Sequence, residues 1–151
     1  ACFFCMGVSS VGMDEAGYRK LTYDLTLHVA NTLLELNKDM TFTYVSGAGT
    51  DSSEKGRIMW ARVKGKTEND LLKMPFKAAY MFRPGYIHPM PGMKNTLKAY
   101  KYLGFLNPFF KILFPNSVCK LSDIGTAMIR VCTQSYSKKV LECKDITLLG
   151  N

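Results

Sequence analysis

The sequence lacks the long apolar run, about 20 residues, that a membrane-spanning helix requires. It also lacks a secretory signal peptide, because no basic region precedes the apolar residues at its start. No initiator Met stands before Ala1, and an apolar, strand-like segment follows at once. We therefore expect a soluble, cytoplasmic protein, and the abrupt start predicts a fragment of a longer chain.

Long blocks of like charge are also missing, although the chain carries a net charge of +8. A basic balance can indicate a nucleic-acid or anionic-membrane partner. Here the basic residues are interleaved with acids along the whole chain. This distribution favours solvated surfaces, with a phosphate-bearing ligand as the alternative, and no motif predicts binding to nucleic acid.

The chain has five cysteines, an odd number, and no secretory signal, which predicts free thiols in a reducing compartment. Cys2 and Cys5 have the spacing of a redox or zinc pair. In a strand, however, residues three apart point to opposite faces, so these thiols are not expected to meet. No metal site is predicted.

The apolar pattern alternates between strand-like and helix-like segments, which is typical of an α/β fold with a parallel sheet and right-handed crossovers. The length of 151 residues suits one domain, and there are no internal repeats. The expected strands are 2–6, 40–45, 76–82 and 140–143, and the expected helices are 15–37, 56–72 and 121–134.

Residues 89–120 depart from this pattern. A cluster of proline and glycine opens the stretch, and aromatic residues crowd 100–114. We expect a subregion on the substrate side, acting as a flap. Two alternatives remain open: a contact in a homodimer, or a membrane-surface patch that includes Lys98, Lys101 and Lys111.

Ligands of parallel α/β sheets bind beyond the carboxyl ends of the strands. Residues 7–10, 46–51 and 83–88 follow successive expected strands, so we expect them to line one crevice. Lys64, on the helix after the second of these loops, is placed to lean towards it. The Gly47-x-Gly49 pair resembles part of a phosphate-binding loop, but the third glycine is missing.

Four segments resemble an atypical short-chain dehydrogenase/reductase. These are "VSGAGTDSSEKGRIMWARVKGKTE", the following "FKAAYMFRPG", the opening "CFFCMGVSS" and the closing "VLECKDITLLG". The branch they resemble is the Tat-interacting-protein-like group, related to the nucleoside-diphosphate-sugar epimerases. The likeness covers essentially the whole chain.

The resemblance implies a Rossmann-like fold that binds NAD or NADP, in an oxidoreductase or epimerase-like enzyme. It implies a catalytic role for Ser46 and Lys64, with Lys64 also holding the nicotinamide ribose. Pro84 and Gly85 would shape the backbone around the nicotinamide, and Gly7 would lie near the dinucleotide.

The first departure from the family is the missing N-terminal half, which carries its glycine-rich phosphate loop and first strands. The chain alone is therefore expected to bind cofactor poorly. The strand at 2–6 would be left with an unpaired, apolar edge, open to aggregation or to pairing with another chain.

The second departure is Trp60, which stands where the family has its catalytic tyrosine, four residues before Lys64. An indole N–H donates a hydrogen bond but cannot shuttle a proton. A water held by Ser46, the carboxylate of Asp51 or the imidazole of His88 would have to replace it. The alternative function is a dinucleotide-binding or protein-interaction protein without catalysis, and a membrane-peripheral module is a third. The sequence specifies neither the substrate nor the choice between NAD and NADP.

Overall fold

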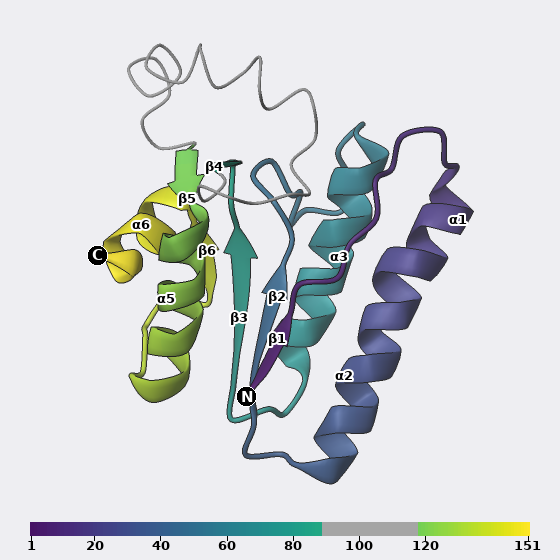
Figure 1. Ribbon diagram of the computed structural model, residues 1–151. Helices are drawn as coiled ribbons and strands as arrows, with labels where there is room; N and C mark the ends of the chain where they lie inside the picture. Colours follow the sequence, from purple (N-terminus) through teal and green to yellow (C-terminus); the bar gives the residue numbers. More distant parts are fainter. Residues whose placement is uncertain (89–117) are drawn as a thin grey trace, which may run out of the picture.

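The computed structural model describes residues 1–88 and 118–151 of the chain. Its centre is a parallel sheet of four strands in the order β1-β2-β3-β6, with helices on both faces (Figure 1). The strands are β1 (Cys2–Phe4), β2 (Thr41–Val45), β3 (Ala78–Arg83) and β6 (Val140–Glu142). The predicted α/β class and parallel sheet are therefore confirmed, and the architecture is consistent with a Rossmann-like fold without being specific to it.

One continuous helical stretch fills the predicted 15–37 region. It consists of α1 (Glu15–Arg19), a π-helical turn η1 (Lys20–Asp24) and α2 (Leu25–Leu36). The Asp14 carboxylate caps its start by accepting a hydrogen bond of 2.8 Å from the Gly17 N–H. In the π turn the Leu25 N–H donates to the carbonyl of Lys20, five residues back. The sequence did not predict this wider turn.

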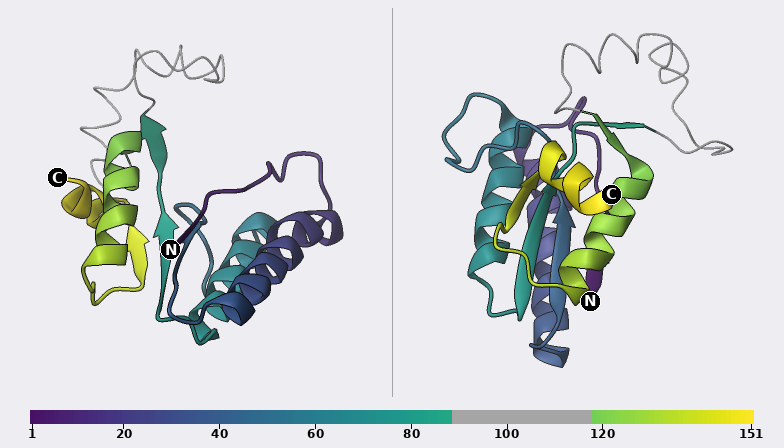
Figure 2. Two further views of the ribbon diagram at one scale, coloured as in Figure 1. Left: turned by 60° about the horizontal axis from the view of Figure 1, so that its bottom comes forward. Right: turned by 90° about the vertical axis from the view of Figure 1, so that its left-hand side faces the viewer.

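The other helices of the described residues are α3 (Met59–Lys73), α5 (Leu121–Thr133) and α6 (Cys143–Gly150). Figure 2 shows α1, α2 and α3 on one side of the sheet and α5 and α6 on the other. A short parallel pair, β4 (Tyr86–His88) with β5 (Val118–Lys120), lies outside the main sheet. Neither this pair nor α6 was expected from the sequence.

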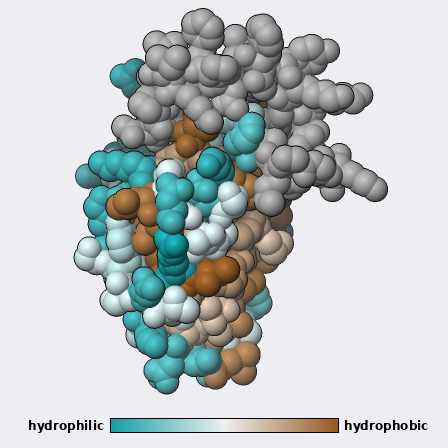
Figure 3. Space-filling model, turned by 60° about the vertical axis from the view of Figure 1, so that its left-hand side comes forward, coloured by the Kyte–Doolittle hydropathy of each residue, from teal (hydrophilic) through white to brown (hydrophobic). Residues whose placement is uncertain are grey.

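Both faces of the central sheet are buried, so its strands are rich in apolar residues throughout. Successive β3 residues alternate between two cores. Met81 packs with the α2–α3 side, and its neighbours Tyr80 and Phe82 pack with the α5–α6 side. Hydrophilic and hydrophobic residues are interspersed over the described part of the outer surface seen in Figure 3.

β1 is an edge strand. It pairs with β2 through Cys2, Phe3 and Phe4, and no other described strand pairs with its second edge. Phe3 is 46% exposed, and further exposed apolar residues follow it, namely Met6, Val8 and Val11. The expectation of an unpaired apolar edge at the first strand is confirmed for the described residues.

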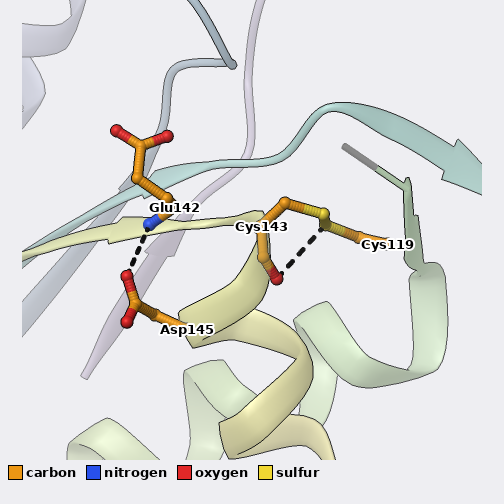
Figure 4. Close-up of a disulfide and its surroundings, with 4 residues drawn as sticks. All are labelled: Cys119, Glu142, Cys143 and Asp145. Carbon is orange, nitrogen blue, oxygen red and sulfur yellow. Dashed lines mark hydrogen bonds between the residues drawn. A yellow bond between two sulfur atoms is a disulfide. The ribbon is translucent and has the colours of Figure 1, made fainter. Parts of the chain in front are cut away.

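The expectation of five free thiols is wrong. Cys119 in β5 and Cys143 at the start of α6 form a disulfide, and both are buried (Figure 4). The two residues are 24 positions apart, a separation that carried no spacing signal. The free cysteines are Cys2, Cys5 and Cys132.

The structure tests two further expectations only in part, the absence of a membrane span and the flap at 89–120. No described helix is both long and apolar enough to cross a membrane. The expected flap at 89–120 lies almost wholly outside the described residues, because only 118–120, which form β5, belong to them.

Candidate functional site

The loops after β2 and β3 meet at the carboxyl edge of the sheet, because the two strands run parallel and in register. The Ser46 N–H donates to the carbonyl of Phe82 at 2.8 Å, and the Ala48 N–H donates to that of Pro84 at 2.9 Å. Gly47 and Gly49 have φ angles of 148° and 85°, which favour glycine, so the chain can turn sharply here. The predicted adjacency of residues 46–49 and Pro84 is therefore present.

Lys64 lies on α3 and reaches this edge. Its ammonium group donates a hydrogen bond to the main-chain carbonyl of Ser46. The side chain is half-buried, and no described carboxylate forms an ion pair with it. Burial lowers the pKa of Lys64 from its ordinary value, while the nearby carboxylate of Glu68 opposes that shift.

The Ser46 side chain is buried, and its hydroxyl has partners inside the protein. Its oxygen lies within hydrogen-bonding distance of the Glu68 carboxylate and, at 3.1 Å, of the Phe82 carbonyl. A hydroxyl has one proton to donate, and the carboxylate is the stronger of these two acceptors. Ser46 therefore points its donor towards α3.

Glu68 is fully buried at the candidate site. It was not among the site residues that the sequence predicted. Nε of Arg83 lies 3.1 Å from each of its carboxylate oxygens, and Nη2 of the same guanidinium also donates to it. Arg83 further contacts the carboxylate of Glu142 at 3.2 Å and the hydroxyl of Ser52 at 2.5 Å. One guanidinium thus joins β3, α3, β6 and the loop after β2. The spacing of Lys64 and Glu68, four residues apart on one helix face, was the available sequence signal.

Trp60 lies in the first turn of α3, on the same helix face as Lys64, and is half-buried. A methyl group on Gly49 would lie 3.6 Å from Cη2 of the indole, so the ring stands beside the 46–49 loop. The ring is therefore placed to form one wall of the site. It supplies no group that can take up or release a proton near neutral pH.

Asp51 shapes the loop between β2 and α3. Its carboxylate accepts hydrogen bonds from the N–H and hydroxyl of Ser53, at 3.0 and 2.6 Å, and from the N–H of Gly56 at 2.6 Å. These bonds, with the Ser53 hydroxyl contributing most, lower the pKa of Asp51. The structure therefore gives this carboxylate a structural task.

Of the other expected residues, Pro84 contacts the 46–49 loop, and no described contact joins Gly7 to it. Pro84 is buried beside the 46–49 loop, and Gly85 leads directly into β4. His88 lies in β4 in register with Lys120 of β5. Gly7 is exposed in the segment after β1, with no atom within 4 Å of the position that a side chain would take.

A separate cavity of about 90 Å³ lies away from this edge, between α3 and the α1–η1 turn. Its lining is mixed in charge and includes Tyr23, Arg62 and Lys66. Arg62 pairs with Glu15 at 2.6 Å, and Lys66 pairs with Asp70 at 2.9 Å. Within residues 1–88 and 118–151, no group of three or more His, Cys, Asp or Glu side chains could hold a metal ion.

The candidate site combines one cationic group with main-chain groups. The Lys64 ammonium has further hydrogen-bond donors, and backbone groups of two loops meet beside it. The 151-residue sequence contains no Gly-x-Gly-x-x-Gly or Gly-x-x-Gly-x-x-Gly loop of the kind that binds pyrophosphate. No protein-family model matches this chain, and a search of curated proteins found no match. The family resemblance therefore stays a prediction.

Proposed function

We propose that this chain forms the nicotinamide-binding part of an NAD(P)-dependent oxidoreductase or epimerase-like protein of the short-chain dehydrogenase/reductase type. The observation that carries the proposal is Lys64. Its ammonium is half-buried at the carboxyl edge of a parallel sheet, and the described partner of its Nζ is a neutral carbonyl, that of Ser46. Such a group has donors left for a ligand.

In this proposal each residue has a binding task. Lys64 donates hydrogen bonds to the nicotinamide ribose, while Pro84, Gly85 and the 46–49 loop shape the backbone around the ring. Trp60 walls the site. Bound NAD(P) supplies hydride exchange with a small-molecule substrate. In this proposal the pyrophosphate is bound by residues outside the 151 of this sequence, because these contain no Gly-x-Gly-x-x-Gly loop.

A second candidate is a dinucleotide-binding or protein-interaction protein that shares this arrangement and does not catalyse a reaction. Two observations favour it. Trp60 cannot transfer a proton, and the Ser46 hydroxyl is directed to Glu68 inside the protein. The catalytic tyrosine that the family resemblance implies is therefore absent, and the hydroxyl at its serine position is engaged inside the protein.

Trp60 allows a direct test, because it is the only tryptophan of the chain. Binding of NADH or NADPH beside it should quench its fluorescence by energy transfer to the reduced nicotinamide. Lys64→Met should weaken this quenching. Lys73→Met, on the same helix but with a side chain that is 74% exposed, should not. The titration is run on this chain and on a longer protein that includes it. No quenching by either nucleotide up to about millimolar concentration, a range that corresponds to weak binding, would refute the proposal.

Trp60→Tyr separates the two candidates, with binding followed by the fluorescence of the nucleotide itself. In an oxidoreductase that has lost its acid, the new hydroxyl four residues before Lys64 should raise turnover. Unchanged binding without turnover would favour the non-catalytic protein.

A further inference from the structure

Glu68 is a buried charge in the middle of the candidate site. Its side chain is excluded from water, and its carboxylate contacts Ser46 and Arg83. Burying a carboxylate is costly unless hydrogen bonds and a counter-charge replace the lost water. The guanidinium of Arg83 provides both, because it donates through Nε and Nη2. The carboxylate is thus fixed in place by β3.

Ser46 connects this fixed carboxylate to Lys64. Its hydroxyl contacts Glu68, its N–H donates to the Phe82 carbonyl at 2.8 Å, and its own carbonyl accepts from the Lys64 ammonium. Three groups of one residue are therefore held at once. The direction of the carbonyl, and with it the place of the Lys64 ammonium, depends on both other contacts.

We propose that Glu68 is a positioning residue, which holds Ser46 so that its carbonyl fixes the Lys64 ammonium at the carboxyl edge of the sheet. The consequence for ligand binding rests on the proposed function, in which Lys64 contacts the dinucleotide. The Ser46 hydroxyl belongs to this internal support and does not serve the ligand.

Several elements of the candidate site carry titratable groups. Glu68 lies one turn after Lys64 on α3, and Arg83 enters from β3. On β2, burial raises the pKa of Tyr44, so this side chain is uncharged, and the Asp51 carboxylate in the following loop accepts hydrogen bonds from its own turn. Glu68 is the anion that opposes the effect of burial on Lys64. Removing its charge should therefore lower the pKa of Lys64.

The first experiment needs no ligand. NMR of the lysine ammonium groups follows the titration of Lys64 and the exchange of its protons with water. Glu68→Gln, of nearly the same shape, should lower the pKa of Lys64 and speed this exchange. Glu142→Gln is the matched control, since Glu142 contacts Arg83 but not Ser46, and both quantities should stay as in the unsubstituted chain. A Lys64 that titrates identically in Glu68→Gln would overturn the proposal.

Glu68→Gln leaves Arg83 without its main counter-charge, which can prevent folding. The double variant Glu68→Gln/Arg83→Met removes that charge, and because losing the nearby guanidinium raises the pKa of Lys64, a smaller decrease is expected, with the faster proton exchange retained. The unsubstituted chain gives an independent answer. Its Lys64 ammonium should exchange more slowly than that of the exposed Lys73, and equal rates would contradict the proposal.

The ligand arm uses NADPH and the quenching of Trp60. Glu68→Gln should bind about tenfold more weakly, the effect of losing one well-placed, charge-assisted hydrogen bond. If neither this chain nor a longer protein that includes it binds nucleotide, the proposed function fails, and the NMR titration still decides whether Glu68 positions Lys64. If NADPH binds equally well to Glu68→Gln, the positioning role in binding is refuted.

Discussion

Replacing Gly65 with alanine should destabilise the fold, although alanine has a higher helix propensity than glycine. Gly65 lies in the interior of α3, where an added Cβ would stand 1.8 Å from the main-chain oxygen of Asp51 and 2.5 Å from its carbonyl carbon. Real contacts of this kind do not fall below 3.0 Å, so the loop would have to retreat by about 1.2 Å, the difference between 3.0 and 1.8 Å. The obstacle is backbone and cannot rotate away.

The magnitude follows from what this retreat disrupts. Overpacking costs about 1–3 kcal/mol, and losing the 3.0 Å bond from the Asp51 N–H to the Ala61 carbonyl costs about 1 kcal/mol. The better helix propensity of alanine offsets about 0.5–1 kcal/mol of this loss. Gly65→Ala should therefore lower the free energy of unfolding by about 2 kcal/mol.

Gly125→Ala is the matched control. This glycine also lies inside a helix, α5, but no atom stands within 4 Å of the new methyl group. Alanine should there stabilise the fold by about 0.5–1 kcal/mol. Chemical denaturation measures the free energy of unfolding of both variants. That of Gly65→Ala should fall and that of Gly125→Ala should rise, so the two variants should differ by about 3 kcal/mol. A Gly65→Ala protein as stable as the parent would show that the loop after β2 does not press on α3 as described.

Two further predictions concern ionisation and thiols. Burial opposes the ionisation of Asp70, but hydrogen bonds hold its pKa at about 2, below its ordinary 3.8; the donors are Lys66, Lys73 and Tyr23. Its stabilising effect is complete above the unfolded pKa and is lost as the pH falls from about 4 to 2, so Asp70→Asn should flatten the acid dependence of unfolding in that window. Alkylation followed by mass spectrometry should label the free Cys2, Cys5 and Cys132 in the folded protein, and denaturation with reduction should be needed to label Cys119 and Cys143. Five labels on unfolded protein without reductant would contradict the disulfide.

The main elements of the sheet could be predicted because their signals are local. The apolar run at 40–45 and the apolar stripe at 15–37 each predict a buried element from the spacing of apolar residues alone. The structure has β2 at the first position and the α1–η1–α2 stretch at the second. Helix α3 begins at Met59, later than the expected residue 56, because Asp51 holds the preceding residues, including Gly56, in turns. Such side-chain bonds to nearby backbone leave little trace in apolar periodicity.

The buried support of the candidate site could not be predicted in this way. Glu68 reads as a surface charge within a polar helix pattern, and its burial follows from a partner 15 residues later, Arg83. The disulfide between Cys119 and Cys143 likewise depends on β5 and α6, two elements that local patterns did not predict. Lys64 and Ser46 were expected at one site because Ser46 directly follows β2 and Lys64 lies on the next helix. In parallel sheets, these segments meet beyond the carboxyl ends of the strands.

The π turn at Lys20–Asp24 bears on how the length of this chain can vary. A π turn accommodates one residue more than an α-helical turn, and the flanking segments keep their faces towards the sheet. Tyr18 before the turn and Ala30 after it are both buried. Deleting one residue within the turn would restore a regular helix without rotating either segment out of the protein. This turn is therefore a position where an insertion or deletion can persist through evolution inside a helix that otherwise tolerates neither.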